Sequence, residues 1–105
     1  MNYYTRALQI FAIAIANERG DKETTEKMQK ETDTKVLEDF VKSEKENTRA
    51  DLYYYGAGRV VEMMTISSST IGLDASNDMI TFENLIFSKE AAPVVEENAN
   101  GEELS

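Results

Sequence analysis

The first 19 residues place the strongest constraint on how this chain folds, because their apolar side chains form one helical stripe. Apolar residues recur there at intervals of one and three positions, the spacing of a single helix face: Tyr3, Tyr4, Ala7, Leu8, Phe11, Ala14 and Ile15. Ile10 and Ile13 widen the stripe. A helix that is apolar over so much of its circumference has to be covered on most sides.

The length of the chain limits what can cover this helix. A chain of 105 residues has room for one small core. It contains no cysteine, so that core must hold by packing alone, without disulfides. Either the rest of this small chain or a second copy must therefore cover the first helix. We favour a second copy, which predicts a homo-oligomer with three self-association residues: Phe11, Ile13 and Ile15.

Residues 21–47 are mostly polar, but their charges are ordered along a helix. A glutamate precedes a lysine by four positions in four places: Glu23 and Lys27, Glu26 and Lys30, Glu31 and Lys35, and Glu38 and Lys42. Each such pair supports a helix by about 0.2–0.5 kcal/mol. Gly20 followed by Asp21 predicts a helix stop and a new N-cap. The charge pattern predicts a long solvated helix after these two residues, with its second half docked and its first half projecting or frayed. A break is expected at residues 32–34, since Thr and Asp prefer caps.

Residues 50–64 show the cleanest helical spacing of apolar side chains: Ala50, Tyr53, Tyr54, Ala57, Val60, Val61 and Met64. The alternative is a β-hairpin at residues 52–66 that turns at residues 56–58, where two glycines lie close together. We favour the helix because the adjacent valines and adjacent methionines break the strict alternation of a strand. The hairpin would make the fold α+β.

The remaining segments complete the expected organisation. A small-residue connector precedes a short last helix that begins near Ser76 or Asn77 and continues to Lys89; a strand at residues 79–82 is the alternative. Residues 90–105 contain five glutamates, no basic residue and the only proline. We therefore predict a mainly α protein with three to four helices in a single domain at residues 1–89, followed by a flexible acidic tail at residues 90–105.

No motif for catalysis, a cofactor or a metal is complete. The chain has neither histidine nor cysteine, and these are the commonest general base and metal ligands. Asp74, Ser76 and Asp78 have the opening spacing of a calcium loop, but a methionine and a leucine occupy the positions of its required glycine and glutamate. The glycine pair at residues 56–58 lacks the third glycine of a phosphate-binding loop. We expect no enzyme, cofactor or metal.

The tyrosine-rich segment is the best candidate for a contact with a protein partner. Tyrosine and arginine are enriched at interaction hot spots, and small residues let two helices approach closely. If Tyr53 and Tyr54 face the core, then Tyr55 and Arg59 share an outward face at a spacing of four residues. We predict six interaction residues: Tyr53, Tyr54, Tyr55, Gly56, Gly58 and Arg59.

The charges divide the chain into two unequal parts. Residues 1–59 carry 10 basic and 11 acidic side chains, whereas residues 60–105 carry 1 and 9. Direct nucleic-acid binding is disfavoured because it needs a basic patch. The opposite hypothesis is a small acidic inhibitor that binds a host protein by imitating nucleic acid. Its weakness is that the acids of residues 1–59 are matched by cations and many of the others lie in the tail.

The apolar run at residues 7–16 is too short to span a membrane, which takes about 20 residues. We expect a cytoplasmic protein; secretion is the alternative if residues 1–16 are a signal peptide, since Ala14 to Ala16 resemble a cleavage site. These observations favour a non-enzymatic protein-interaction or assembly protein, of the kind found among small viral and phage proteins.

Overall fold

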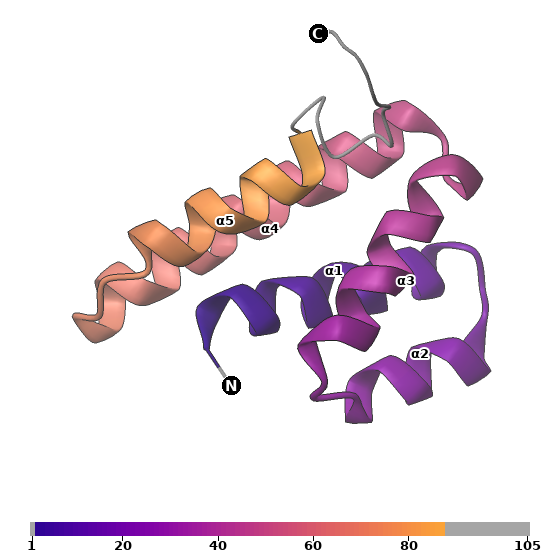
Figure 1. The fold of residues 1–105 in the computed structure, drawn as a ribbon, viewed down its shortest axis with the longest axis horizontal. Coiled ribbons are helices and arrows are strands. Elements are labelled where there is room, and N and C mark those ends of the chain that lie inside the picture. Colours follow the sequence, from indigo (N-terminus) through magenta and orange to yellow (C-terminus); the bar gives the residue numbers. More distant parts are fainter. Residues whose placement is uncertain (1, 88–105) are drawn as a thin grey trace, which may run out of the picture.

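The computed structural model describes residues 2–87 and contains five helices and no strand within that range (Figure 1). These are α1 (Tyr3–Glu18), α2 (Lys22–Lys30), α3 (Thr34–Asn47), α4 (Ala50–Ile71) and α5 (Ser76–Phe87). The mainly α prediction is confirmed. The hairpin alternative at residues 52–66 is wrong, because α4 runs through all of them. The predicted tail at residues 90–105 and the domain boundary at Lys89 lie outside the described residues.

The fold has one helix more than the predicted maximum, because the polar segment forms two helices. The break lies between Lys30 and Thr34, where it was expected. Asp33 ends the break by accepting a hydrogen bond from the Lys35 backbone N–H at 2.9 Å. This is the usual role of an aspartate before a helix, where backbone N–H groups have no partner inside the helix.

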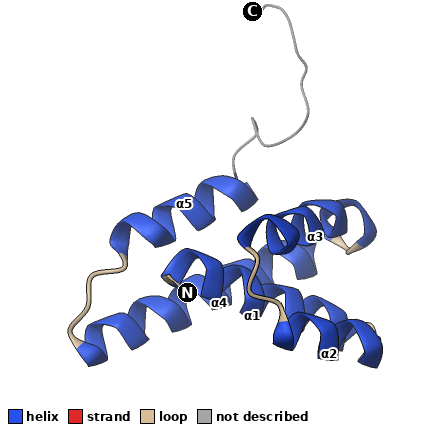
Figure 2. Cartoon of the chain, turned by 60° about the horizontal axis from the view of Figure 1, so that its bottom comes forward, coloured by secondary structure: helices blue, strands red, loops and turns tan. Residues whose placement is uncertain are grey.

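Helix α1 is the centre of the domain and packs against each of the other four helices. Its buried apolar side chains are Ala7, Leu8, Phe11, Ala12, Ile15 and Ala16. Helices α4 and α5 run side by side, joined by a short connection, as both ribbon views show (Figures 1 and 2). The chain therefore covers its most apolar helix mainly with its own residues.

Three aromatic rings form the middle of the core. Phe11 of α1 lies 5.1 Å from Tyr53 of α4 and 6.0 Å from Phe82 of α5, measured between ring centroids. The rings meet at tilted and edge-on angles, the arrangement that aromatic pairs prefer. All three are buried. Phe11 therefore ties the first helix to the helical pair at the other end of the sequence.

Gln9 is a polar residue inside the apolar stripe of α1, and its buried side chain fixes the end of α2. The Gln9 amide nitrogen lies 3.1–3.2 Å from the backbone carbonyl oxygens of Met28, Gln29 and Glu31. It can thus donate to backbone carbonyls at the C-terminus of α2, where the last turn of a helix leaves carbonyl groups without their usual partner four residues on. Met28 is buried as well, so the expectation that this segment projects or frays is wrong.

The helix ends follow local sequence at two glycines. Gly20 and Gly72 adopt positive φ angles of 73° and 77°; Gly72 directly follows α4, and Gly20 follows α1 after one residue, Arg19. Glycine is favoured in this left-handed conformation because it has no Cβ to clash. Asp21 then caps α2 by accepting a hydrogen bond from the Thr24 N–H at 3.0 Å. The helix stop and new cap expected at Gly20 and Asp21 are confirmed.

Replacing Phe11 with alanine should destabilise the fold strongly. The substitution removes a ring that is 1% exposed and that touches two other aromatic rings. A Phe→Ala change in a core costs about 3–5 kcal/mol, which is a large share of the total for a small domain. Urea unfolding followed by circular dichroism measures the loss. Tyr55→Ala, at an exposed ring, is the control, and equal losses in the two variants would contradict this core.

Candidate interaction surface

The three consecutive tyrosines of α4 point in different directions. Tyr53 is 2% exposed and donates a hydrogen bond from its hydroxyl to the Val41 carbonyl at 2.9 Å. Tyr54 is partly exposed and stacks on Phe87, with ring centroids 5.5 Å apart. Tyr55 is 63% exposed. The predicted contact surface is therefore not a single tyrosine cluster, since successive helix positions turn by about 100°.

The two glycines of α4 have different neighbours. A Cβ built on Gly56 would lie 3.3 Å from the Phe11 ring, so this glycine lets α1 approach α4 closely. A Cβ built on Gly58 would have nothing within 4 Å. Gly56 thus belongs to the core packing. Packing among the described residues does not require a glycine at position 58. Glycine inside a helix nevertheless costs about 1 kcal/mol relative to alanine.

The side of α4 that points away from the core is lined by exposed side chains at intervals of three and four. We call this surface the outer face of α4; it comprises Leu52, Tyr55, Gly58, Arg59, Glu62, Met63 and Ile66. Leu52 is 42% exposed, Met63 45% and Ile66 66%. The buried residues Tyr53, Ala57, Val60 and Met64 lie on the opposite side of the helix. No other described element covers the outer face.

Arg59 lies at the middle of the outer face and is held along the helix by its neighbours. Its guanidinium donates a hydrogen bond to the Tyr55 hydroxyl at 3.0 Å, and its Cζ lies 5.9 Å from the Tyr55 ring centroid. Its Nε is 3.9 Å from a Glu62 carboxylate oxygen. The Arg59 pKa is raised, mainly by the hydrogen bond to Tyr55. As predicted from their spacing, Tyr55 and Arg59 share an outward face.

The residues predicted for self-association on α1 are placed differently. Phe11 and Ile15 are buried in the chain's own core, and Ile13 is half-buried. A second copy cannot reach Phe11 or Ile15 without opening the fold. The reason is that α2, α3, α4 and α5 together cover more of α1 than the length of the chain suggested. Ile13 alone retains some accessible surface.

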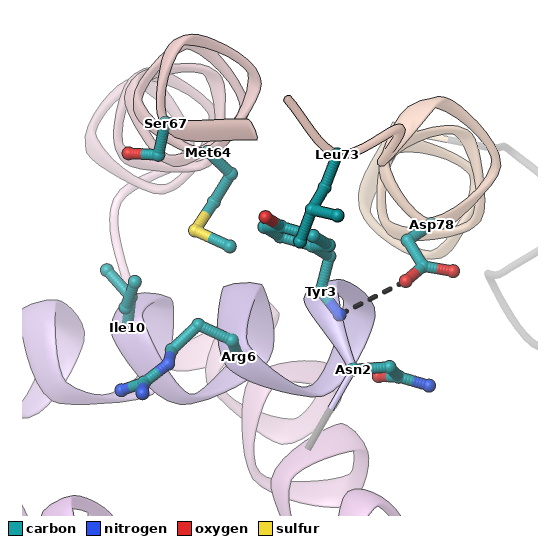
Figure 3. A pocket seen from close by; sticks show the side chains of 8 residues that line it. All are labelled: Asn2, Tyr3, Arg6, Ile10, Met64, Ser67, Leu73 and Asp78. Carbon is teal, nitrogen blue, oxygen red and sulfur yellow. Dashed lines mark hydrogen bonds between the residues drawn. The ribbon is translucent and has the colours of Figure 1, made fainter. Parts of the chain in front are cut away.

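Several hollows lie beside these helices. One of about 380 Å³ lies on α4 itself and is lined by Arg59, Val60, Glu62, Met63, Ile66 and Ser67. Another, about 490 Å³, lies between the end of α1 and the start of α4, and its lining includes Leu52, Tyr53, Tyr55 and Gly56. A third, about 540 Å³, lies between α1, α4 and the start of α5 (Figure 3). In that view Ile10 and Arg6 of α1 lie across from Met64 and Ser67 of α4, and the Tyr3 N–H donates to Asp78 at 3.1 Å.

The described residues provide neither a metal-binding cluster nor a helix that could span a membrane. Among residues 2–87, no set of three or more acidic, histidine or cysteine side chains is placed to hold a metal ion. Of the described helices, none combines the length and the apolar character that crossing a membrane requires. Comparisons of the chain with protein-family models, with curated proteins and with solved structures found no match.

Exchanging each glycine of α4 for alanine tests the two roles assigned to them. Gly58→Ala should raise the free energy of unfolding by about 1 kcal/mol, because alanine favours the helix and its methyl group meets nothing. Gly56→Ala should gain less, since its methyl group presses on the Phe11 ring. Urea unfolding at low protein concentration measures both. Equal gains would show that α1 does not need Gly56.

Burial also changes the acidity of Tyr53. Loss of solvent, and to a smaller extent the nearby Tyr54 and Glu44, raise the pKa of Tyr53 to about 12, compared with about 10 in an unfolded chain. The folded state therefore favours the neutral phenol. This contribution to stability is complete below about pH 10 and is lost as the pH rises toward 12. Burial and a hydrogen bond to Glu38 raise the pKa of Tyr4 in the same direction.

We expect Tyr53→Phe to lower stability at pH 8 and to flatten its fall at alkaline pH. The variant loses the hydrogen bond to Val41, which costs about 1 kcal/mol, and removes one phenol whose ionisation opposes folding. Urea unfolding at several pH values between 8 and 11 gives both effects. Part of the slope should remain because Tyr4 still ionises. An unchanged slope would mean that Tyr53 is not held neutral by burial.

Proposed function

We propose that this chain is a non-enzymatic protein-interaction or assembly component and that the outer face of α4 is its binding surface. The supporting observation is the side of a 22-residue helix that no other described element covers and that presents four apolar or aromatic side chains. Exposed apolar groups that gather on one face are typical of contact surfaces, whereas single ones are ordinary. Tyr55 and Arg59 are residue types that often carry binding energy.

The rival hypothesis of an acidic nucleic-acid mimic receives less support from the placement of charges. Acidic side chains on α2 and α3 alternate with lysines, and Lys35 forms an ion pair with Asp39 at 3.1 Å. A surface that imitates phosphates would present acids without interspersed cations. The outer face of α4 is mixed as well, with one arginine and one glutamate at its centre. A mainly apolar contact therefore describes this face better.

Ile66→Asp is the variant that tests the binding surface. Ile66 is 66% exposed, so the fold should keep its stability while a desolvated aspartate opposes association. The tagged chain should retain protein from its native source, or retain its own untagged copy, and the variant should retain at least tenfold less. The matched control is Ile80→Asp on α5, at a residue that is 53% exposed.

Circular dichroism of both variants shows whether the helices are intact. If Ile66→Asp and Ile80→Asp retain the same proteins as the unchanged chain, the outer face of α4 is not the binding surface. If the unchanged chain retains nothing and stays monomeric at high concentration, the interaction function itself is withdrawn.

A further inference from the structure

We infer that the partner of the outer face of α4 is the same face of a second copy, packed antiparallel about a two-fold axis between Val60 and Val61. This inference rests on the proposed function, because it names the occupant of the same surface. A two-fold interface uses one patch on both copies and must be complementary to itself. The outer face of α4 is complementary to itself. It carries one base and one acid, large and small residues, and apolar side chains on both sides of the axis.

The pairing follows from the order of residues along the helix. In an antiparallel pair about this axis, a residue of one copy lies level with a residue of the other copy. The two residues are equally many positions before and after the axis along the helix. Arg59 then meets Glu62 of the other copy, and the same ion pair forms a second time by symmetry. Tyr55 meets Ile66 of the other copy. By symmetry this apolar pair also forms twice. One Tyr55–Ile66 pair therefore lies on each side of the two ion pairs.

Gly58 supplies the close approach that this arrangement needs. The same axis places Gly58 level with Met63 of the other copy, but five helix positions turn by about 500°, so the two residues lie toward opposite edges of the contact. A Cβ built on Gly58 would meet nothing within 4 Å among the described residues. A residue without a Cβ in the contact lets the second helix come closer, because the distance between packed helices depends on the side chains between them. The pairing thus gives a physical reason for a helix glycine that the monomer leaves unexplained.

The two charges also select this register over a neighbouring one. Moving the axis to Arg59 itself would set the two arginines against each other, which is unfavourable. Within one chain the Arg59 and Glu62 side chains are 3.9 Å apart and both are well exposed, so their pairing there is worth little. Between copies, the flanking apolar side chains would exclude water from the same two groups and strengthen their attraction.

The size of the contact predicts its strength. Leu52 and Ser69 stand opposite each other in this register, so the contact extends over 17 steps of a helix, about 26 Å. One helix from each copy makes an interface at or below the small end of the range for stable complexes, about 1,200 Å². We therefore expect a dimer that forms at high concentration and dissociates on dilution.

Charge reversal at the axis tests the inference. Arg59→Glu alone and Glu62→Arg alone each create two like-charged contacts, and each should weaken dimerisation more than about tenfold. The double variant restores opposite charges and should dimerise as the unchanged chain does. An equimolar mixture of the two single variants should also dimerise, because one copy then carries two acids and the other two bases. Sedimentation equilibrium over a concentration series measures all four samples.

The control is the matched pair Lys35→Glu and Asp39→Lys on α3, which reverses an exposed ion pair elsewhere and should leave dimerisation unchanged. A monomeric wild-type chain at every concentration would overturn the inference, and so would single variants at Arg59 or Glu62 that dimerise normally. If the chain is monomeric but Ile66→Asp abolishes capture of a different protein, the inference fails while the proposed function stands. If Ile66→Asp affects neither assay, both fail.

Discussion

The burial of α1 is the constraint on which the rest of this structure depends. A small domain has few ways to cover a helix that is apolar over most of its surface, and here all four remaining described helices take part. Phe11 brings α4 and α5 together through ring contacts, while Gln9 holds the end of α2 through backbone carbonyls. Neither contact is local in sequence, so removing α1 would leave the other helices without a common core.

The same arrangement explains why α4 has an uncovered side. With 22 residues it is the longest described helix, and α1 and α5 pack against the side that carries Tyr53, Ala57, Val60 and Met64. After covering α1, the described residues supply no element for the opposite side. Gly56 and Gly58 lie only two positions apart, yet one admits the Phe11 ring and the other faces open space. This difference separates the folding role of α4 from its proposed binding role.

Much of the local structure could be predicted from the sequence, because periodicity and capping act over a few residues. The helical spacing of α1 and α4, the stop at Gly20, the cap at Asp21 and the break before Thr34 all appear where expected. Thr48 differs: its spacing of three residues from Asp51 is typical of a helix N-cap, but it ends α3, and α4 begins at Ala50 without a side-chain cap. Two adjacent helix ends share few residues, and packing decides their division.

The sequence by itself therefore determined that the described chain is mainly helical, where most helices begin and end, and that Tyr55 and Arg59 share a face, because each follows from short-range geometry. Only the tertiary structure decided which apolar residues remain accessible. Phe11 and Ile15 look like surface for a second copy until four helices cover them, whereas Tyr54 belongs to the same predicted stripe as the buried Tyr53 and yet stays partly exposed. Periodicity identifies the faces of a helix, but the helices packed around it decide which face meets solvent.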